Sequence, residues 1–209
     1  MKRIESQSML VGQGLGAGLL GLAALALGAV PLAPVLCAED AAPARAVRLS
    51  SVDGQVQLLL SKQVLADQAV ANMPLFEGTE VVTADDGRAE IQFEDGSVAR
   101  LSPNSSLALT VLRGQGGAGD AEIALESGLG YFELQGSGQA GPIRVRFGDS
   151  VVTASGFTVL RINLDNPSGE LAVFSGNAHV ERGNVLTLEL HGGESVEMNA
   201  AEPGRISAV

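Results

Sequence analysis

The sequence predicts an all-β fold, in which many short antiparallel strands form a sandwich, a roll or a β-solenoid-like stack. After Arg45, apolar residues recur at every second position in runs of four to seven residues. Gly, Asp and Asn residues separate these runs, as tight turns between strands require. No segment after Arg45 keeps an apolar period of 3.6 residues, so we expect no helix there.

The N-terminal segment has the composition of an export signal. Lys2 and Arg3 precede an uncharged apolar run of 22 residues, Leu15–Leu36, for which we expect an apolar helix. Ala42-Pro43-Ala44 then matches the small-x-small pattern of signal peptidase sites, and cleavage after Ala38 is the other option. An uncleaved single-pass inner-membrane anchor is the alternative, because the run is near the length of a membrane span. In both cases the positive residues predict that the remainder lies outside the cytoplasm, in the periplasm or the extracellular space.

The expected domain organisation follows from this change of pattern. Residues 1–44 are a signal peptide or signal anchor with a short linker, residues 45–200 a β domain, and residues 201–209 a C-terminal tail. Cys37 is the only cysteine, so an intrachain disulfide is excluded. Lipid attachment at Cys37 stays open as an alternative, although Pro34 and Leu36 fit the lipoprotein pattern poorly.

The strands after Arg45 are assigned from alternation and turn residues. Asp53-Gly54 predicts a hairpin, and Asp95-Gly96 predicts a type I′ turn. Lys62–Asn72 is ambiguous between a helical turn and an irregular strand. The expected strands are 47–52, 56–60, 80–83, 89–93, 98–101, 107–112, 121–125, 130–134, 143–147, 150–153, 157–163, 170–174, 178–181, 185–190 and 195–198. Glycine-rich loops are expected at 113–120 and 136–141.

The β region contains an internal similarity. Phe76–Ala84 contains the sequence Val-Val-Thr-Ala after a short turn, and Phe147–Ala154 repeats it about seventy residues later. In each copy a glycine and another strand follow. The sequence therefore suggests two similar halves.

Composition excludes several classes of partner. The formal net charge is -11, so the chain repels phosphate backbones and anionic membranes, and we expect no nucleic acid partner. Contact with a membrane is expected only through the N-terminal apolar segment, if that segment is uncleaved. Aromatic residues make up 3% of the chain, which disfavours a stacking platform for sugars.

No residue pattern points to catalysis or to a bound metal. His179 and His191 are the only histidines and are expected to be solvated strand residues. The sequence has no Gly-x-Ser-x-Gly elbow, phosphate loop or dinucleotide fingerprint. Acidic turns at Asp85-Asp86, Glu94-Asp95 and Asn163–Glu170 lack the spacing of a calcium loop. We therefore expect no enzyme, no cofactor and no metal site.

One block of residues resembles the FecR family. Gly-Thr-Glu-Val-Val-Thr is followed by Gly-Arg-Ala-Glu-Ile-Gln-Phe, Asp-Gly-Ser, Arg-Leu and Pro-Asn-Ser. The residues that carry this motif are Gly78, Thr83, Gly87, Phe93, Asp95, Gly96, Ser97, Leu101, Pro103 and Asn104. Looser similarity continues through 128–132, 154–157 and 171–180, so the resemblance covers about residues 46–198.

The resemblance implies an exported FecR-like domain that acts as a non-catalytic protein-interaction or sensory module of the cell envelope, with an envelope protein as its partner. FecR sensors carry a cytoplasmic segment that binds a sigma factor. Only 14 residues precede Leu15 here, so we expect that segment to be lacking. The alternatives are a membrane-anchored signalling regulator of the ferric-citrate sensor type and a wall-polymer or carbohydrate-binding protein.

Overall fold

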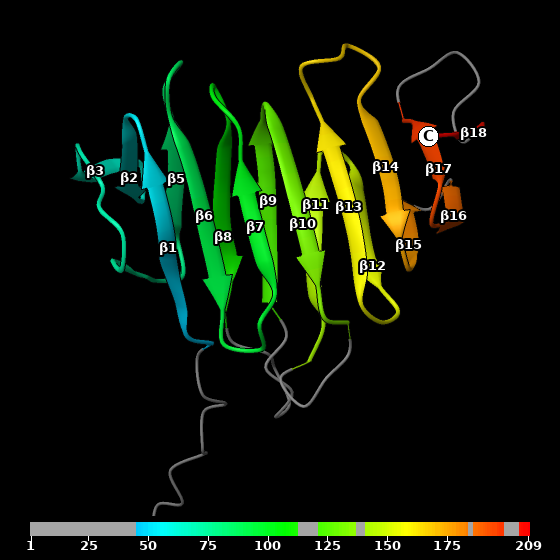
Figure 1. The fold of residues 1–209 in the computed structure, drawn as a ribbon, viewed down its shortest axis with the longest axis horizontal. Helices are drawn as coiled ribbons and strands as arrows, with labels where there is room; N and C mark the ends of the chain where they lie inside the picture. The colour runs from blue at the N-terminus through cyan, green and yellow to red at the C-terminus, as the bar shows by residue number, and fades with distance from the viewer. Residues whose placement is uncertain (1–44, 113–120, 137–140, 184–185, 199–204) are drawn as a thin grey trace, which may run out of the picture. The chain divides into compact units, whose positions relative to one another are not determined.

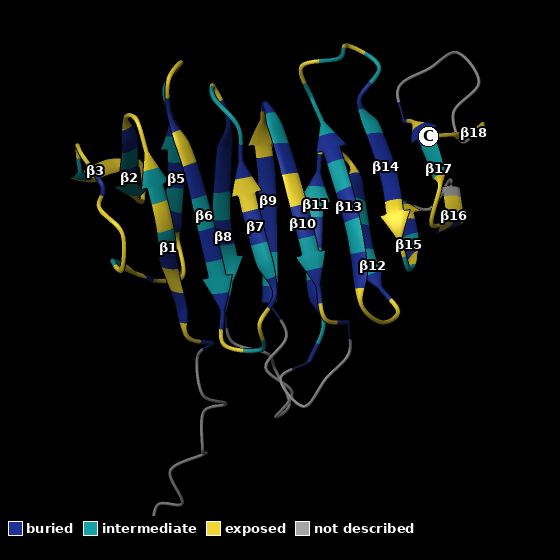
Figure 2. Ribbon diagram, viewed as in Figure 1, coloured by how far each residue is buried: buried dark blue, intermediate teal, exposed yellow. Residues whose placement is uncertain are grey.

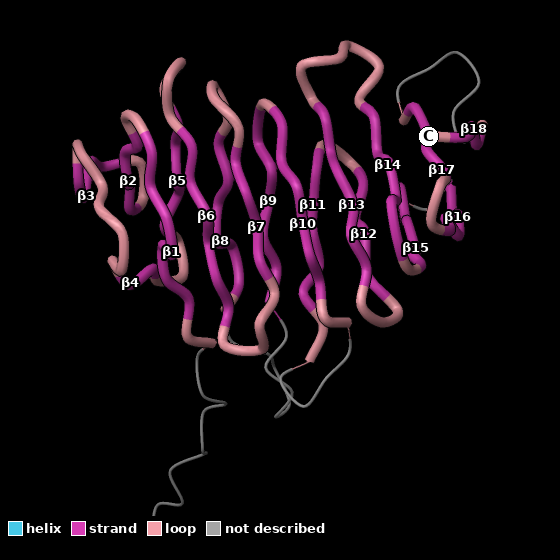
Figure 3. The backbone as a smooth tube through the Cα atoms, viewed as in Figure 1, coloured by secondary structure: helices cyan, strands magenta, loops and turns pink. Residues whose placement is uncertain are grey.

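The computed structural model describes residues 45–112, 121–136, 141–183, 186–198 and 205–209, and for Leu186 the backbone alone. The chain divides into two compact units, Met1–Glu39 and Asp40–Val209, and every described residue belongs to the second. The expected N-terminal helix lies outside the described residues. All regular elements in the described residues are strands, which confirms the all-β prediction (Figure 3). Accordingly, no helix in this part of the chain is long and apolar enough to cross a membrane.

The strands form two nine-stranded sheets (Figure 1). In spatial order, sheet A contains β18 (Ile206–Ala208), β17 (Glu194–Glu197), β14 (Glu170–Ser175), β13 (Thr158–Asn163), β10 (Leu129–Leu134), β7 (Val98–Leu101), β6 (Arg88–Phe93), β1 (Val47–Asp53) and β4 (Pro74–Leu75). Sheet B contains β16 (Leu186–His191), β15 (Asn177–Arg182), β12 (Ser150–Ala154), β11 (Ile143–Phe147), β9 (Ala121–Ser127), β8 (Ser106–Val111), β5 (Thr79–Thr83), β2 (Val56–Leu60) and β3 (Gln63–Ala66).

The chain crosses repeatedly between the sheets, and later strands are added on the same side of both sheets. The strand pairs β6–β7 and β13–β14 lie in sheet A, and β8–β9, β11–β12 and β15–β16 lie in sheet B. Among the pairs in the described residues, β9 and β11 run parallel and all others run antiparallel. They are parallel because β10, which joins them along the chain, lies in the opposite sheet. Most pairing therefore joins strands that are close in sequence.

The core lies between the two sheets, because alternate residues of each strand point inward. β5, β11 and β12 share one burial pattern, in which the first, third and fifth residues are buried (Figure 2). Ile91 and Phe93 of β6 are buried, while Arg88 faces water. Phe132 is among the largest fully buried side chains, and Leu, Ile and Val supply most of the remainder. Full burial of each such side chain contributes about 1.5–3 kcal/mol.

The strand order repeats, which confirms the suggested duplication. From β5 to β10 the strands belong to sheets B, A, A, B, B and A, and β12 to β17 follow the same sequence. β5 pairs with β2 and β8, and the corresponding strand β12 pairs with β11 and β15. The repeated Val-Val-Thr-Ala segments therefore occupy matching positions in sheet B.

Two turn predictions are wrong. Asp53-Gly54 does not close a hairpin, because β1 and β2 lie in different sheets and do not pair. Gly54 is required there by its φ of +66° and by the close approach of the Asp86 carbonyl. At Asp95-Gly96 only the glycine has a positive φ, +88°, so the turn is not type I′. Gly96 N–H donates to the Phe93 carbonyl, which gives a type I turn followed by a glycine bulge.

Three short strands lie where the alternation of apolar residues is weak. The ambiguous stretch 62–72 contains no helix and forms the irregular strand β3, whose pairing with β2 shifts register beside Leu58. The two-residue strand β4 pairs with the start of β1. Residues 206–208, in the expected C-terminal tail, form β18 and pair with β17.

Candidate functional site

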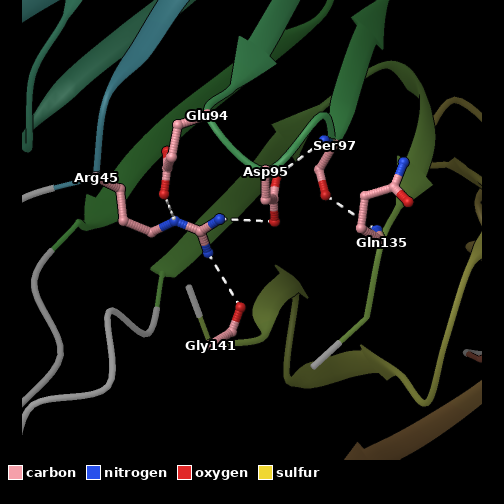
Figure 4. Close-up of polar contacts among 6 residues, drawn as sticks. All are labelled: Arg45, Glu94, Asp95, Ser97, Gln135 and Gly141. Atoms are coloured by element: carbon pink, nitrogen blue, oxygen red, sulfur yellow. Dashed lines mark hydrogen bonds and ion pairs between the residues drawn. The ribbon is translucent and has the colours of Figure 1, made fainter. Parts of the chain in front are cut away.

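The first described residue, Arg45, is held inside the domain by acidic residues of the motif hairpin. Its side chain is 1% exposed. Arg45 Nε donates to Glu94 Oε1 at 2.6 Å, and Nη2 donates to Asp95 Oδ2 at 2.7 Å (Figure 4). Nη1 donates to the Gly141 carbonyl at 3.3 Å. We call Arg45, Glu94, Asp95 and Gly141 the Arg45 junction.

Backbone and ring contacts add to the junction. Arg45 N–H donates to the Leu112 carbonyl, and Glu94 N–H donates to the Ala46 carbonyl. The guanidinium carbon lies 5.9 Å from the centre of the Phe93 ring, which is within the range of a cation–π contact. Arg45 and Ala46, which we call the entry segment, are therefore fixed both by backbone hydrogen bonds and by the buried charge of Arg45.

The turn that carries Glu94 and Asp95 is itself well fixed. Asp95 Oδ1 accepts a hydrogen bond from Ser97 N–H at 2.8 Å, so this carboxylate shapes the turn while also binding Arg45. Ser97 is buried, and its hydroxyl accepts a hydrogen bond from Gln135 N–H just beyond β10 (Figure 4). The junction thus joins Arg45 to the β6–β7 turn and to Gly141 before β11, and Ser97 of the same turn binds Gln135 after β10.

A hollow of about 310 Å³ lies beside the junction. The lining residues lie where the start of β1 pairs with the end of β6. The lining consists of Ala46, Val47, Arg48, Gln92, Phe93 and Glu94. Its wall is shared with the junction through Glu94, and it also includes Phe93, whose ring contacts Arg45. A group that entered this hollow would therefore contact the entry segment and the motif hairpin together.

The remaining motif residues lie mainly at the other end of β7. Thr83 Oγ1 donates to the Ser102 carbonyl at 2.7 Å and accepts from Ser105 N–H at 2.9 Å. Pro103 and Asn104 form the corner between β7 and β8, where Asn104 has a φ of +57°. Asn104 N–H donates to the Ala84 carbonyl, which ties this corner to the end of β5. The motif thus forms two separate turn clusters.

The other predicted motif residues have structural surroundings. Leu101 and Phe93 are buried at opposite ends of the β6–β7 hairpin. Gly78 precedes β5 with a φ of +84°. Gly87 lies in the β5–β6 turn, where a Cβ atom would approach the Gln55 carbonyl to 2.2 Å. The structural role of these positions remains a prediction. The structure adds Arg45, which was not among the predicted motif residues, as the charged partner of Asp95.

The two histidines lie on the strand pair β15–β16. His179 Nδ1 faces Glu189 and Nε2 faces Glu181, so both ring nitrogens have carboxylate partners. The hydrogen bond with Glu189, supported by that with Glu181, raises the pKa of His179 above its ordinary value despite opposing desolvation. His191 Nδ1 lies 2.7 Å from Asn177 Oδ1. Both histidines therefore serve as strand residues with polar partners.

Of the acidic turns considered for calcium, Glu94-Asp95 binds Arg45, and the other two direct oxygens to backbone N–H groups. Asp86 Oδ1 accepts from Gln55 N–H, and Asn163 Oδ1 accepts from Asp165 N–H. Within the described ranges no group of three or more His, Cys, Asp or Glu residues is arranged to hold a metal ion.

The outer face of sheet A carries a ladder of charges beside exposed aromatic rings. Arg100 pairs with Glu90 and Glu133 on the neighbouring strands β6 and β10. A hydrogen bond from the Ser50 hydroxyl, together with Arg100, lowers the pKa of Glu90. Tyr131 lies opposite Arg161 in the β10–β13 register.

Arg161 also contacts a second ring on this face. Its guanidinium carbon lies 5.8 Å from the centre of the Phe174 ring, and its Nη2 donates to Glu170 Oε2. Tyr131 is 37% exposed and Phe174 42% exposed. We call Tyr131, Arg161 and Phe174 the sheet A aromatic patch.

Sequence reasoning missed the Arg45 junction. The signal available was a lone arginine directly before the first alternating strand, together with an acidic Glu-Asp-Gly turn. Glu94 and Asp95 lie 49 and 50 residues away along the chain. Alternation cannot predict that pairing, because it depends on how β1 registers against β6.

Comparisons with known proteins agree with the sequence resemblance. The family model described as "FecR protein" matches residues 79–179, which include β5 to β14 and the start of β15. No curated protein matches the chain.

Among solved structures, two crystal structures of a candidate anti-sigma factor from Parabacteroides distasonis ATCC 8503 are similar, with TM-scores of 0.48 and 0.49 and 16% sequence identity. Each alignment covers 62% of this chain and 58% of that chain, so the similarity spans less than two thirds of the other protein. The family match covers most of the repeated strands, and the motif turns lie within it, apart from Gly78 at its border. The chain therefore carries a FecR protein domain over residues 79–179.

Proposed function

We propose that this chain is an exported FecR-type regulator whose β domain is a non-catalytic sensory and protein-interaction module outside the cytoplasm. The observation that carries the proposal is the Arg45 junction, in which Arg45, ahead of the FecR match, binds Glu94 and Asp95 inside it. It fixes the segment that enters the domain to the hairpin that carries the family motif. A displacement at the β6–β7 turn would therefore act on Arg45, the residue that precedes the first strand.

The coupling has a physical basis in the burial of the charge. The Arg45 side chain is 1% exposed, whereas those of Glu94 and Asp95 are 33% and 11% exposed, so separation would leave the buried guanidinium without its counter-charges. This contact therefore resists separation. A partner that binds the β6–β7 turn or the adjoining hollow would act on the entry segment through this contact.

The location and the interaction role are tested in cells that produce the full-length protein. N-terminal sequencing with membrane fractionation is expected to give an extracytoplasmic protein that begins near Glu39 or Arg45, or an uncleaved anchor in the inner membrane. Only the uncleaved form is compatible with signalling across the membrane by this chain itself. Recovery of the protein from the cytoplasm would contradict the proposal.

The partner is sought by crosslinking in the intact envelope, followed by capture of the protein. We expect an envelope protein to be recovered with the wild type and to be reduced with R45M, while R88M behaves as the wild type. Arg88 is a suitable control because its own ion pair, with Asp53, is exposed. Capture of nothing above background with the wild type would count against an interaction module.

Binding of a wall polymer is the second candidate, because the sheet A aromatic patch offers two rings and a guanidinium on one face. Aromatic rings provide stacking surfaces for sugars. If this function holds, the protein should co-sediment with insoluble peptidoglycan. Y131A/F174A should lose that binding and F76A should retain it. Equal binding by all three proteins would contradict this candidate.

A further inference from the structure

Strand β3 is an edge strand with a large apolar exposure. It is the last strand of sheet B on its side, so one row of its backbone hydrogen-bonding groups has no partner strand. Three of its four residues are exposed, including Val64 at 56% and Leu65 at 50%. Single exposed apolar residues are ordinary, whereas a cluster at a strand edge marks a site of association.

The exposure is concentrated around this strand. Ten large apolar side chains are exposed in the described residues, and five of them lie within residues 60–76. These five are Leu60, Val64, Leu65, Val70 and Phe76, which we call the edge patch. The edge patch includes the tip of the β2–β3 hairpin and the segments on both sides of β4.

β4, the edge strand of sheet A at the same end of the domain, is protected against pairing with another strand, whereas β3 is not. β4 is two residues long and contains Pro74, which cannot donate a backbone hydrogen bond. β3 has no proline and no charged residue between Gln63 and Ala66. One of the two edges at this end of the molecule is therefore open to strand addition.

The charges that flank β3 select the partner. Lys62 precedes the strand and Asp67 follows it, and both are exposed. When a short strand pairs antiparallel with its own copy, the beginning of each strand lies beside the end of the other. Lys62 of each copy then lies near Asp67 of the other, twice in one interface. In a parallel arrangement of two copies, like charges would face each other.

We infer that β3 pairs antiparallel with β3 of a second copy of this chain, joining the two B sheets across a two-fold axis. The interface covers Val64 and Leu65 of both copies and places opposite charges at both ends of the new pair. Such a contact is isologous and closed, so it stops at a dimer. This inference goes beyond the proposed function and does not depend on the signalling role.

The net charge sets the conditions of the test. Two chains with a formal charge of -11 repel one another, and this repulsion is screened beyond about 8 Å at physiological ionic strength. The protein is therefore purified in the form that the cell produces from the full-length gene. Its sedimentation velocity is measured near 0.15 M salt over a range of protein concentrations. We expect a concentration-dependent monomer–dimer equilibrium.

Charge reversal distinguishes this dimer from other contacts. K62D and D67K should each weaken dimerisation about tenfold, because like charges then face each other at both ends. A mixture of the K62D and D67K chains should form a heterodimer with nearly wild-type affinity, since opposite charges are restored at both ends. The double variant K62D/D67K should also recover affinity. D149K, in the exposed β11–β12 turn, makes the same charge change as D67K and should leave dimerisation unweakened.

Crosslinking supplies an independent measurement. In a C37S background, V64C should form a disulfide-linked dimer under mild oxidation, and F157C, which is 52% exposed elsewhere, should not. Thermal unfolding should be nearly unchanged in every charge variant, since both positions are exposed. A monomer at all concentrations would overturn the inference. So would a dimer indifferent to K62D and D67K, or larger open-ended assemblies built from β3 and a different edge.

Discussion

At the scale of single residues, the molecule depends on a few polar contacts at the ends of strands. Arg45 binds two carboxylates of a neighbouring turn, and Thr83 binds the backbone of the corner between β7 and β8. Both side chains are buried, so removing their partners lowers the free energy of unfolding more than breaking an exposed ion pair does. The surface pairs of the sheet A ladder are partly solvated, and contribute less.

Removal of the Arg45 side chain tests this difference. R45M leaves Glu94 and Asp95 without the cation that binds them. Because these carboxylates are 33% and 11% exposed, water offsets part of the loss, and the free energy of unfolding should fall by about 1–3 kcal/mol. R88M removes an exposed ion pair and should change it by less than about 0.5 kcal/mol. Urea unfolding of the full-length protein measures both. Equal midpoints for R45M and the wild type would show that the junction is not stabilising.

His179 gives the fold a pH dependence whose sign follows from its partners. Hydrogen bonding to Glu189 and Glu181 raises its pKa above the ordinary value of 6.5. Because the folded protein holds this proton more tightly than the unfolded chain does, the stabilisation is complete below pH 6.5. It is lost as the pH rises through the higher folded value.

The measurement compares urea unfolding of the wild type and H179Q at pH 6 and pH 8.5. The stability difference between the two proteins should be larger at pH 6 than at pH 8.5. E189Q, which removes the principal partner, should reduce that pH dependence. A difference independent of pH would contradict the assignment.

At the scale of strands, single glycines decide where the chain changes sheets. Gly128 joins β9 to β10, and Gly176 joins β14 to β15, with φ values of +81° and +83°. In both places a Cβ atom would meet a neighbouring side chain or backbone at less than 2.7 Å. The crossing between sheets therefore needs both the left-handed conformation and the missing side chain.

Alanine at two positions with positive φ separates these requirements. G128A adds a clash with the Ser105 hydroxyl, which lies 2.2 Å from where the new methyl group would stand, and should destabilise the protein by about 2–5 kcal/mol. Gly148 has a φ of +52° with open space around it, so G148A should cost about 1–2 kcal/mol. Thermal or urea unfolding ranks the two variants. Equal losses would show that conformation alone matters at Gly128.

Sequence alternation predicted most strands but not their arrangement. Period-two patterns identify Ala89, Ile91 and Phe93 as inward residues, because one face of each strand meets the core. They do not say which of two sheets receives a strand, so Asp53-Gly54 predicted a hairpin where the chain changes sheets. β3 was ambiguous because a register shift interrupts the alternation beside Leu58. The Arg45 junction depends on contacts between distant residues, which local patterns do not contain.

At the scale of the whole domain, stability is unevenly distributed. β6, β7, β10 and β13 have partner strands on both sides, while β3, β4, β16 and β18 have a partner on one side. Edge strands open with less loss of contact than central strands do. The domain therefore combines a rigid middle with weaker ends.

Hydrogen exchange of backbone amides should follow that distribution. We expect the slowest exchange in the central strands of both sheets and the fastest in β4 and β18. β3 should exchange quickly at low protein concentration and more slowly as concentration rises, if it pairs with a second copy. Mass spectrometry of proteolytic fragments resolves these segments. Fast exchange in β6 and β7 would contradict the proposed rigid middle.

The alternating path between two sheets that grow in one direction also has a consequence for synthesis. From β3 onward, each new strand pairs with a strand made before it: β7 with β6, β8 with β5, and β13 with β10. Little of the pairing must wait for the C-terminus. The molecule can therefore assemble progressively from its beginning while the remaining chain is still emerging, and each completed layer serves as the template for the next.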